Sequence, residues 1–240
     1  MTSPRYIDFH GHFLPGMDDG SRNEEQSLSM LHTMKEQGIK TAFATPHFYA
    51  DDERIPAFLE RREAAYERLK PYLTDEHPEI RLGAEVRHYD GISRLDGLQK
   101  LCAEDTELLL LEMPFTRWTD YSIDEVLELA SGGGVTVVLA HIERYYGMQK
   151  KNVWEKFLLG GILLQINASM FESFFEKRKA LSWFEKQMIH FIGSDCHNDT
   201  TRPPNAGKAF EVLKEKMGER FVGSLLHFEE KTLANKRIKI

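Results

Sequence analysis

The hydrophobic positions of the chain gather into short apolar runs that alternate with amphipathic segments. The runs predict strands at residues 5–10, 39–47, 80–86, 107–115, 135–141, 162–169 and 189–197. The amphipathic segments predict helices at residues 23–38, 55–73, 122–134, 152–161, 174–187 and 205–218. Several runs are continuously apolar, which is typical of strands buried on both faces. Strand–helix alternation of this kind predicts a parallel sheet with helices packed outside it.

Seven strand–helix units in 240 residues favour a closed or nearly closed α/β barrel, with an open, doubly wound sheet as the alternative. No repeat, low-complexity tract or linker divides the chain, so we interpret residues 1–240 as one domain. Two of the predicted helices begin with capping signals. Asn23 opens the first helix, and Ser122 with Glu125 three residues later forms a capping-box pattern.

The composition is that of an ordinary globular protein, with 41% hydrophobic and 29% charged residues. A net charge of −7 argues against a general nucleic-acid-binding surface, so no nucleic-acid partner is expected. No apolar run approaches the roughly 18 residues of a membrane span, so no membrane insertion is expected. The N-terminus lacks the features of a secretory signal, and Cys102 and Cys196 provide no disulfide framework. Together these features indicate a cytoplasmic protein.

Histidines and carboxylates stand at the carboxyl ends of six of the seven predicted strands. The residues are His10, His12, His47, Glu85, Glu112, His141, Asp195 and His197, with Asp19 in the loop after the first strand. Any one of them alone is more often structural or exposed than a ligand. In a parallel barrel, however, all carboxyl ends meet at one face, so these side chains are expected to converge. Other histidines do not share that position and are interpreted as structural or exposed, namely His32, His77, His88, His190 and His227.

The expected cluster holds five imidazoles and four carboxylates, a set that suits Mn, Fe, Zn or Mg. Nine ligands exceed what one ion needs, so two or three divalent ions are expected. Clustered ions generate hydroxide and clamp the oxygens of a displacement at phosphorus. Arg144 and Arg202 follow two ligand-bearing strand ends and can bind phosphate through their guanidinium groups. For either arginine, a solvated loop position is an equally good interpretation.

Six motifs together resemble the PHP (polymerase and histidinol phosphatase) superfamily. Within it they are similar to the bacterial protein-tyrosine phosphatases of capsule and exopolysaccharide synthesis. The motifs are DFHGHFLPGMDDGS, ATPHF, GAEVR, AHIERY, QINAS and GSDCHN. The resemblance implies a distorted (β/α)7 barrel that hydrolyses phosphotyrosine by metal-hydroxide attack. Its implied substrate is a phosphorylated protein, with a bacterial tyrosine kinase as the expected partner.

The resemblance also implies a trinuclear site, with Mn²⁺ as the first choice and Fe or Zn as alternatives. His10, His12, Glu85 and Asp195 would hold one ion; Glu85, Glu112 and His141 a second; Asp19, His47 and His197 the third. Arg144 and Arg202 match the family's phosphate-binding arginines.

The chain departs from the family pattern at three positions, none of which removes a ligand. Phe48 stands where a second histidine is common, Ile142 where proline is common, and Cys196 where alanine is common. Cys196 and Arg202 happen to fit the Cys-x5-Arg spacing of thiol-based tyrosine phosphatases. Flanking aspartates would raise the pKa of that thiol, so we interpret Cys196 as a packing residue.

Two other functions remain open at this stage. One is a small-molecule phosphoesterase of the same fold, such as a histidinol-phosphate phosphatase, and the other is a metal-binding protein without turnover. Aromatic residues in the strand-end loops are candidate contacts for an aromatic substrate, although many could equally be packing residues. They are Phe48, Tyr49, Phe115, Trp118, Tyr145 and Tyr146.

Overall fold

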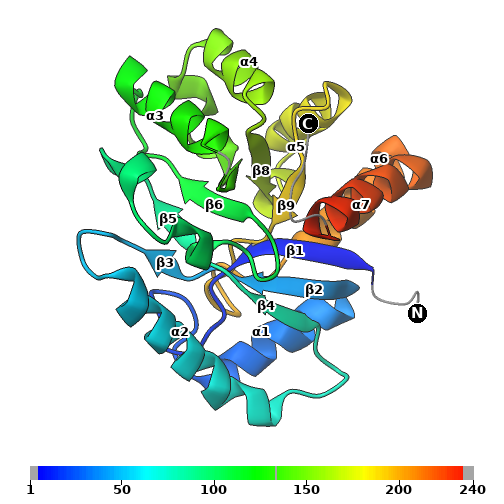
Figure 1. Ribbon diagram of the computed structural model, residues 1–240. Helices are drawn as coiled ribbons and strands as arrows, with labels where there is room; N and C mark the ends of the chain where they lie inside the picture. The colour runs from blue at the N-terminus through cyan, green and yellow to red at the C-terminus, as the bar shows by residue number, and fades with distance from the viewer. Residues whose placement is uncertain (1–4, 133, 235–240) are drawn as a thin grey trace.

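The computed structural model describes residues 5–132 and 134–234, and its strands form a curled parallel sheet (Figure 1). Within these residues the strands are β1 (Tyr6–Gly11), β2 (Ile39–Ala44), β3 (His47–Phe48), β4 (Glu79–Leu82), β5 (Glu85–Arg87), β6 (Leu108–Glu112), β7 (Thr136–Leu139), β8 (Leu163–Asn167) and β9 (Phe191–Gly193). The order is β1-β2-β4 in one sheet and β3-β5-β6-β7-β8-β9 in the other, and every paired strand runs parallel.

Two of the predicted strands are each divided into two. Thr45 and Pro46 separate β2 from β3, because proline has no N–H to donate to a ladder. Gly83 and Ala84 separate β4 from β5 at the matching position, so β2 pairs with β4 and β3 with β5. The seven predicted strands are therefore correct in place, and only these interruptions raise their number to nine.

Strands β1 and β9 lie side by side and bring the two sheets together. Gly11 and Cys196 form a parallel bridge, and the Asp195 N–H donates to the His10 carbonyl over 2.8 Å. A side chain at Gly193 would lie 2.4 Å from His10 Cβ, so glycine permits this close approach. The sheet thus curls round on itself, which confirms the predicted distorted barrel and excludes the open sheet.

The interior of the barrel is apolar and contains aromatic side chains from several strands. The rings of Phe9 and Phe191 stack with centroids 4.2 Å apart. Phe228 and Leu233 of helix α7 pack against this cluster, near the amino ends of the strands. The cluster comprises Ile7, Phe9, Phe43, Ala103, Leu108, Leu110, Val138, Ala140, Leu163, Phe191 and Leu233.

The helices surround the sheet. They are α1 (Glu24–Glu36), α2 (Ile55–Leu69), α3 (Asp120–Ser131), α4 (Lys151–Leu159), α5 (Phe174–Glu185), α6 (Ala206–Met217) and α7 (Glu219–Ala234). Short 3-10 turns lie at Lys70–Tyr72, Ile92–Arg94, Leu98–Leu101, Ile142–Arg144, Tyr146–Met148 and Ala168–Phe171. Helices α1 and α2 lie on the side of β2 and β4, whereas α3 and α4 lie beyond β6 (Figure 1). In the described ranges, none of the helices combines the length and the hydropathy that crossing a membrane requires.

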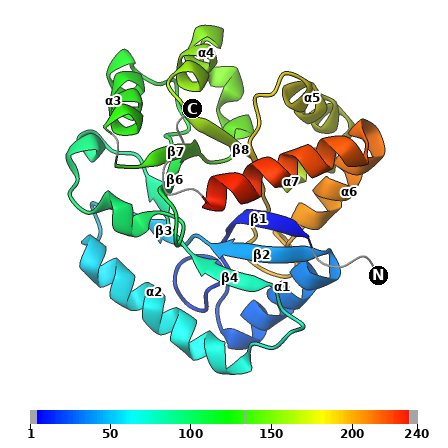
Figure 2. The ribbon, with the colours of Figure 1, turned by 45° about the vertical axis from the view of Figure 1, so that its right-hand side comes forward.

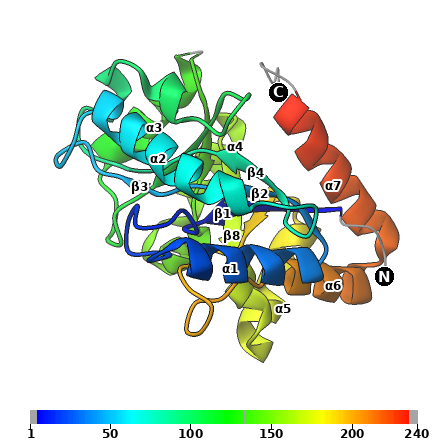
Figure 3. The ribbon, with the colours of Figure 1, turned by 90° about the horizontal axis from the view of Figure 1, so that it is seen from below.

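Helix α6 begins against the end of α1, and the two lie along the same edge of the molecule (Figure 3). Gln37 donates from Nε2 to the Pro204 carbonyl over 2.8 Å. A Cβ at Gly207 would lie 2.2 Å from the Gln37 carbonyl oxygen, so the close packing requires glycine there. Helix α7 then turns back across the molecule beside β1 (Figure 2).

Two helix predictions need correction. The third helix begins at Asp120 with Thr119 as its N-cap, and not at Ser122, because the Thr119 side chain accepts the Ser122 N–H. Glu125 is buried and accepts the Gly91 N–H instead of completing a capping box. Helix α7 was not predicted, although Val222, Leu225 and Leu226 follow a helical period.

Glu229 is the most unusual residue of α7, since it is completely buried. Neither of its carboxylate oxygens has a hydrogen-bond partner among the described residues. Burial, with a smaller contribution from Glu230, raises the pKa of Glu229 well above its ordinary value. The folded chain therefore holds this proton more tightly than the unfolded chain does.

This difference predicts that the Glu229→Gln variant is more stable than the wild type at pH 8. Because the pKa of Glu229 is higher in the folded chain, the folded state of the wild type loses stability as the pH rises above the pKa of the unfolded chain, about 4.5. The gain in melting temperature, about 2–4 °C per kcal/mol, should shrink as the pH approaches 4.5. Thermal unfolding across this range measures it, with the exposed neighbour Glu230→Gln as control. Parallel pH profiles for wild type and Glu229→Gln would contradict the prediction.

Candidate metal centre

The carboxyl ends of the strands bring all nine predicted side chains together. Their elements are β1 for His10, the loops that follow β1 for His12 and Asp19, β3 for His47, β5 for Glu85, β6 for Glu112, and the segments after β7 and β9 for His141, Asp195 and His197. Most of these side chains are buried, while Asp19 is two-thirds exposed at the mouth of the site. The structure therefore shows the convergence that is expected for a barrel.

Glu85 lies at the middle of the cluster. Its Oε2 lies 3.3 Å from His10 Nε2 and 3.4 Å from His12 Nε2. The same oxygen lies 2.9 Å from His47 Nδ1. Its Oε1 lies 2.8 Å from His141 Nε2. One carboxylate thus faces four imidazoles, which is the arrangement expected of a bridging ligand.

The two aspartates complete the cluster on either side. Asp195 Oδ1 lies 3.7 Å from His10 Nε2 and 3.5 Å from His12 Nε2. Asp19 Oδ1 lies 3.4 Å from the Nε2 atoms of both His47 and His197. On the other side, Glu112 Oε1 lies 3.4 Å from His141 Nε2. Eight of the nine groups thus fall into three sets that overlap at His12 and His47, and His141 joins them through its contact with Glu85.

Several atoms of the cluster lack the partners that buried polar groups normally have. His10 Nε2 and His12 Nε2 face each other at 3.1 Å. Glu85 Oε2, His47 Nδ1 and His141 Nδ1 are buried without a hydrogen bond in the described part of the chain. Such orphaned atoms carry a desolvation cost unless a ligand satisfies them. Nitrogen and oxygen donors at these separations fit divalent cations.

The carboxylates give the cluster a strong preference for positive charge. Burial opposes protonation of His12, but its hydrogen bonds to Asp18 and Glu85 raise the pKa to about 10. Burial also opposes protonation of His141, yet Glu112 and Glu85 raise the pKa of that imidazole to about 9. Cations bound among the carboxylates would take the place of these protons.

Two residues of the cluster have backbone conformations that side-chain-bearing residues rarely adopt. His141 has a φ of 31° and Asp195 a φ of 51°, both in the left-handed region. Conformations of this kind cost of order 1–3 kcal/mol each and persist where the surroundings enforce them. The strained residues lie just after β7 and β9, where the His141 and Asp195 side chains turn into the cluster.

Sequence reasoning missed three residues that orient the cluster. Asp18 Oδ2 accepts from His12 Nδ1 over 2.7 Å and from the His47 N–H over 3.0 Å, which leaves His12 Nε2 free to face inward. Gln165 Oε1 lies 3.3 Å from His10 Nδ1, and Asn167 donates to Asp195 over 2.8 Å. The QINAS motif of β8 contained the signal, since β8 is the strand without a predicted ligand.

Arg144 and Arg202 both reach the cluster from the loops after β7 and β9. Each guanidinium pairs with Asp195 Oδ2, and the Arg202 contact is 2.8 Å long. Both side chains are more than one-third exposed. They therefore lie between the buried centre and solvent, where an anionic group would enter.

Cys196 lies next to the cluster but faces away from it. It is completely buried beside Gly11, and burial raises the pKa of its thiol well above the ordinary value. Arg202 pairs with Asp195 and not with the thiol. The structure therefore supports the interpretation of Cys196 as a packing residue.

Only part of the aromatic set lies at the mouth of the site. The Tyr49 ring stacks on His47 at 5.4 Å, and the half-exposed Phe115 ring lies 5.8 Å from His141. Arg144 lies over Phe115 at 5.7 Å. The other candidates serve the packing of the domain: Phe48, Trp118 and Tyr145 are buried, and Tyr146 stacks on Trp154.

Comparisons with known proteins identify the family. The sequence model described as "Capsular polysaccharide synthesis, CpsB/CapC" matches residues 6–234. The chain belongs to the CpsB/CapC family. The PHP-type capsule-family resemblance is thereby confirmed.

Relatives in two bacteria are similar over nearly their whole length. Tyrosine-protein phosphatase YwqE of Bacillus subtilis is 32% identical, covering 97% of this chain and 93% of its own. Tyrosine-protein phosphatase CpsB of Streptococcus pneumoniae is 29% identical, covering 89% and 92%. A crystal structure from work on YwqE and CpsB, described as unique metal-dependent tyrosine phosphatases, superposes with a TM-score of 0.82 at 29% identity, over 97% of this chain and 96% of that one.

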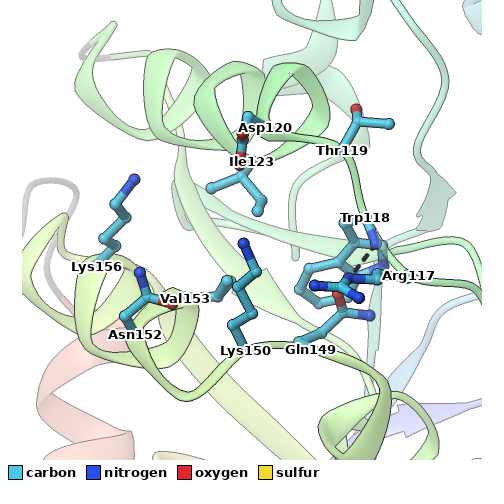
Figure 4. A pocket seen from close by; sticks show the side chains of 10 residues that line it. All are labelled: Arg117, Trp118, Thr119, Asp120, Ile123, Gln149, Lys150, Asn152, Val153 and Lys156. Carbon is cyan, nitrogen blue, oxygen red and sulfur yellow. Dashed lines mark hydrogen bonds between the residues drawn. The ribbon is translucent and has the colours of Figure 1, made fainter.

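This member of the CpsB/CapC family also has a basic pocket of about 250 Å³ (Figure 4). It lies between the beginnings of α3 and α4 and is lined by Arg117, Trp118, Thr119, Asp120, Ile123, Gln149, Lys150, Asn152, Val153 and Lys156. The backbone N–H of Trp118 donates to Gln149 Oε1 over 3.0 Å and joins the two walls. Three cationic side chains against one carboxylate make the pocket suited to an acidic ligand.

The position of Asp18 predicts that Asp18→Asn lowers metal affinity by about 10–100-fold. The Asp18 carboxylate accepts hydrogen bonds from N–H groups of His12, His47 and Gly20. The NH2 group of an asparagine would bring a donor against at least one of these N–H groups. Competition with a chromophoric chelator measures the affinity, and the exposed Asp199→Asn serves as control. An unchanged dissociation constant in folded Asp18→Asn would remove Asp18 from the centre.

Proposed function

We propose that the chain is a metal-dependent protein-tyrosine phosphatase that acts in capsular or exopolysaccharide synthesis. The observation that carries the proposal is the convergence of nine nitrogen and oxygen ligands with two arginines at the barrel mouth. A purely structural metal site would be closed and would have no need of an anion clamp. The names of the CpsB/CapC relatives support the same activity.

The centre would hold two or three divalent ions, with Mn²⁺ as the first choice and Fe or Zn as alternatives. His10, His12, Glu85 and Asp195 are assigned to one ion, Glu85, Glu112 and His141 to the second, and Asp19, His47 and His197 to the third. The observed geometry differs from this assignment in one detail, because His47 Nδ1 faces Glu85 while its Nε2 faces Asp19. Bound ions of this kind lower the pKa of water and polarise phosphoryl oxygens.

The residues of the chain then position the substrate. Arg144 and Arg202 bind the phosphoryl oxygens and stabilise the negative charge that develops on them. Tyr49 and Phe115 flank the entrance and can contact the phenyl ring of a phosphotyrosine on either side. Asp195 holds both guanidinium groups in place through its buried carboxylate.

A protein substrate is favoured over a small phosphate ester such as histidinol phosphate. The basic pocket between α3 and α4, with Arg117, Lys150 and Lys156, would offer contacts to residues of a protein substrate other than its phosphotyrosine. Acidic residues near the phosphotyrosine of such a substrate could pair with the cationic side chains of this pocket. A bacterial tyrosine kinase is the proposed partner, and the cytoplasm is the proposed location.

The decisive experiment measures hydrolysis before and after metal removal. Exhaustive chelation should abolish activity, and Mn²⁺ should restore it. A phosphotyrosine peptide should react faster than the matched phosphoserine peptide and faster than histidinol phosphate, because a phenol with a pKa of about 10 leaves more readily than an alkoxide.

Each outcome of this experiment is informative. Faster hydrolysis of histidinol phosphate would favour the small-molecule phosphoesterase instead. An inert protein after reloading with Mn²⁺, Fe²⁺ or Zn²⁺ would favour a metal-binding protein without turnover.

The buried thiol provides a second test of the mechanism. Cys196→Ser should retain most of the activity, because a thiol with a raised pKa is a poor nucleophile. Cys102→Ser is a matched control, since it also removes a buried thiol, far from the centre. A folded, metal-loaded Cys196→Ser protein without activity would refute the metal-dependent mechanism and favour a thiol-based one.

A further inference from the structure

A second group of metal-ligating side chains lies outside the nine residues of the centre. His88 follows β5, Asp90 lies two residues further along, and Glu125 is on α3. One ligand atom of each residue lies within 4.8 Å of the other two. None of the three belongs to the sets that surround Glu85, and sequence analysis interpreted His88 as structural or exposed.

The two inner residues of this group are buried and incompletely bonded. His88 is 5% exposed and Glu125 is 4% exposed. His88 Nε2 and Glu125 Oε2 face each other over 3.2 Å, but neither atom makes a hydrogen bond of acceptable geometry within the described ranges. Buried polar atoms without partners are rare in folded proteins and call for a ligand or an explanation.

The surroundings orient the carboxylate and hold the backbone beside the imidazole. Glu125 Oε1 accepts the Gly91 N–H over 2.7 Å and the Ser93 hydroxyl over 3.4 Å, which directs Oε2 toward His88. The His88 backbone N–H donates to the Glu112 carbonyl over 2.8 Å. The carboxylate is therefore directed toward His88 by contacts that do not involve the imidazole.

The geometry repeats that of the main centre. Metal–ligand bonds of about 2.0–2.2 Å place two ligands of a tetrahedral ion roughly 3.3–3.6 Å apart. The 3.2 Å separation of His88 Nε2 and Glu125 Oε2 is close to this range, as are the 3.3 Å and 3.4 Å separations that Glu85 makes with His10 and His12. In both places the facing atoms are buried, and Glu85 Oε2, like His88 Nε2 and Glu125 Oε2, has no hydrogen-bond partner in the described ranges.

We propose that His88, Asp90 and Glu125 form a second metal site, which binds one divalent transition-metal ion such as Zn²⁺. The buried imidazole and carboxylate supply two fixed ligands, and the exposed Asp90 supplies a third from the solvent side. One nitrogen and two oxygen donors, completed by water, suit this class of ion. The ion would tie α3 to the segment after β5 and leave the reaction at the main centre to the other nine residues.

Native mass spectrometry of the full-length chain tests the proposal by counting bound ions. The protein is stripped with chelator, reloaded with excess Zn²⁺ and desalted. Wild type should carry one more Zn²⁺ ion than His88→Gln or Glu125→Gln. Asp90→Asn should bind that last ion at least tenfold more weakly, while Asp124→Asn, an exposed change on the same helix, should match wild type.

Two further measurements keep the result unambiguous. Zn²⁺ should slow amide hydrogen exchange in residues 88–94 of wild type, and this protection should be lost in Asp90→Asn. Phosphatase activity with Mn²⁺ should be unchanged in Asp90→Asn, so failure of the second site is distinguishable from failure of the proposed function. The exposed position of Asp90 makes this variant informative even if the two buried variants do not fold. Equal Zn²⁺ counts and affinities in wild type and Asp90→Asn would overturn the proposal and leave His88 and Glu125 as an ordinary ion pair.

Discussion

The buried carboxylate of Glu85 is the constraint on which the carboxyl end of the barrel depends. A carboxylate removed from water is costly unless positive charge compensates it. Here four imidazoles surround it within 2.8–3.4 Å, and they come from β1, the loop after β1, β3 and the end of β7. Each of those strands must end at the correct height for its side chain to reach the same point.

The division of two strands follows from this requirement. The break at Thr45 and Pro46 separates β3 from β2, and the break at Gly83 and Ala84 separates β5 from β4. In the second sheet His47 is paired directly with Glu85. The hydrogen-bond ladder is thus interrupted just before the ligands His47 and Glu85. The positive φ angles of His141 and Asp195 likewise direct ligand side chains into the cluster at two other strand ends.

The two ends of the barrel surround their buried carboxyl groups with opposite environments. The amino end is closed by apolar side chains of α7, and burial there raises the pKa of both Glu229 and Asp8 above their ordinary values. At the carboxyl end burial opposes ionisation of Glu85 and Asp195, but the histidines around them lower the pKa of both carboxyl groups. Asp195 alone pairs with two guanidinium groups and accepts from Asn167. Stability is therefore concentrated in the apolar interior and function at the charged mouth.

The sequence by itself determined where the strands lie along the chain, the parallel barrel and the nine residues of the candidate centre, because histidines and carboxylates recur at the same end of the apolar runs. Local patterns do not show which polar atoms are left without partners, since that depends on residues distant in the chain. The roles of Asp18, Gln165 and Asn167, the true start of α3 and the addition of α7 were therefore decided by tertiary structure. The pairing of His88 with Glu125, 37 positions later by their residue numbers, is of the same kind. It exists only because α3 packs against the segment after β5, a long-range contact that no local periodicity encodes.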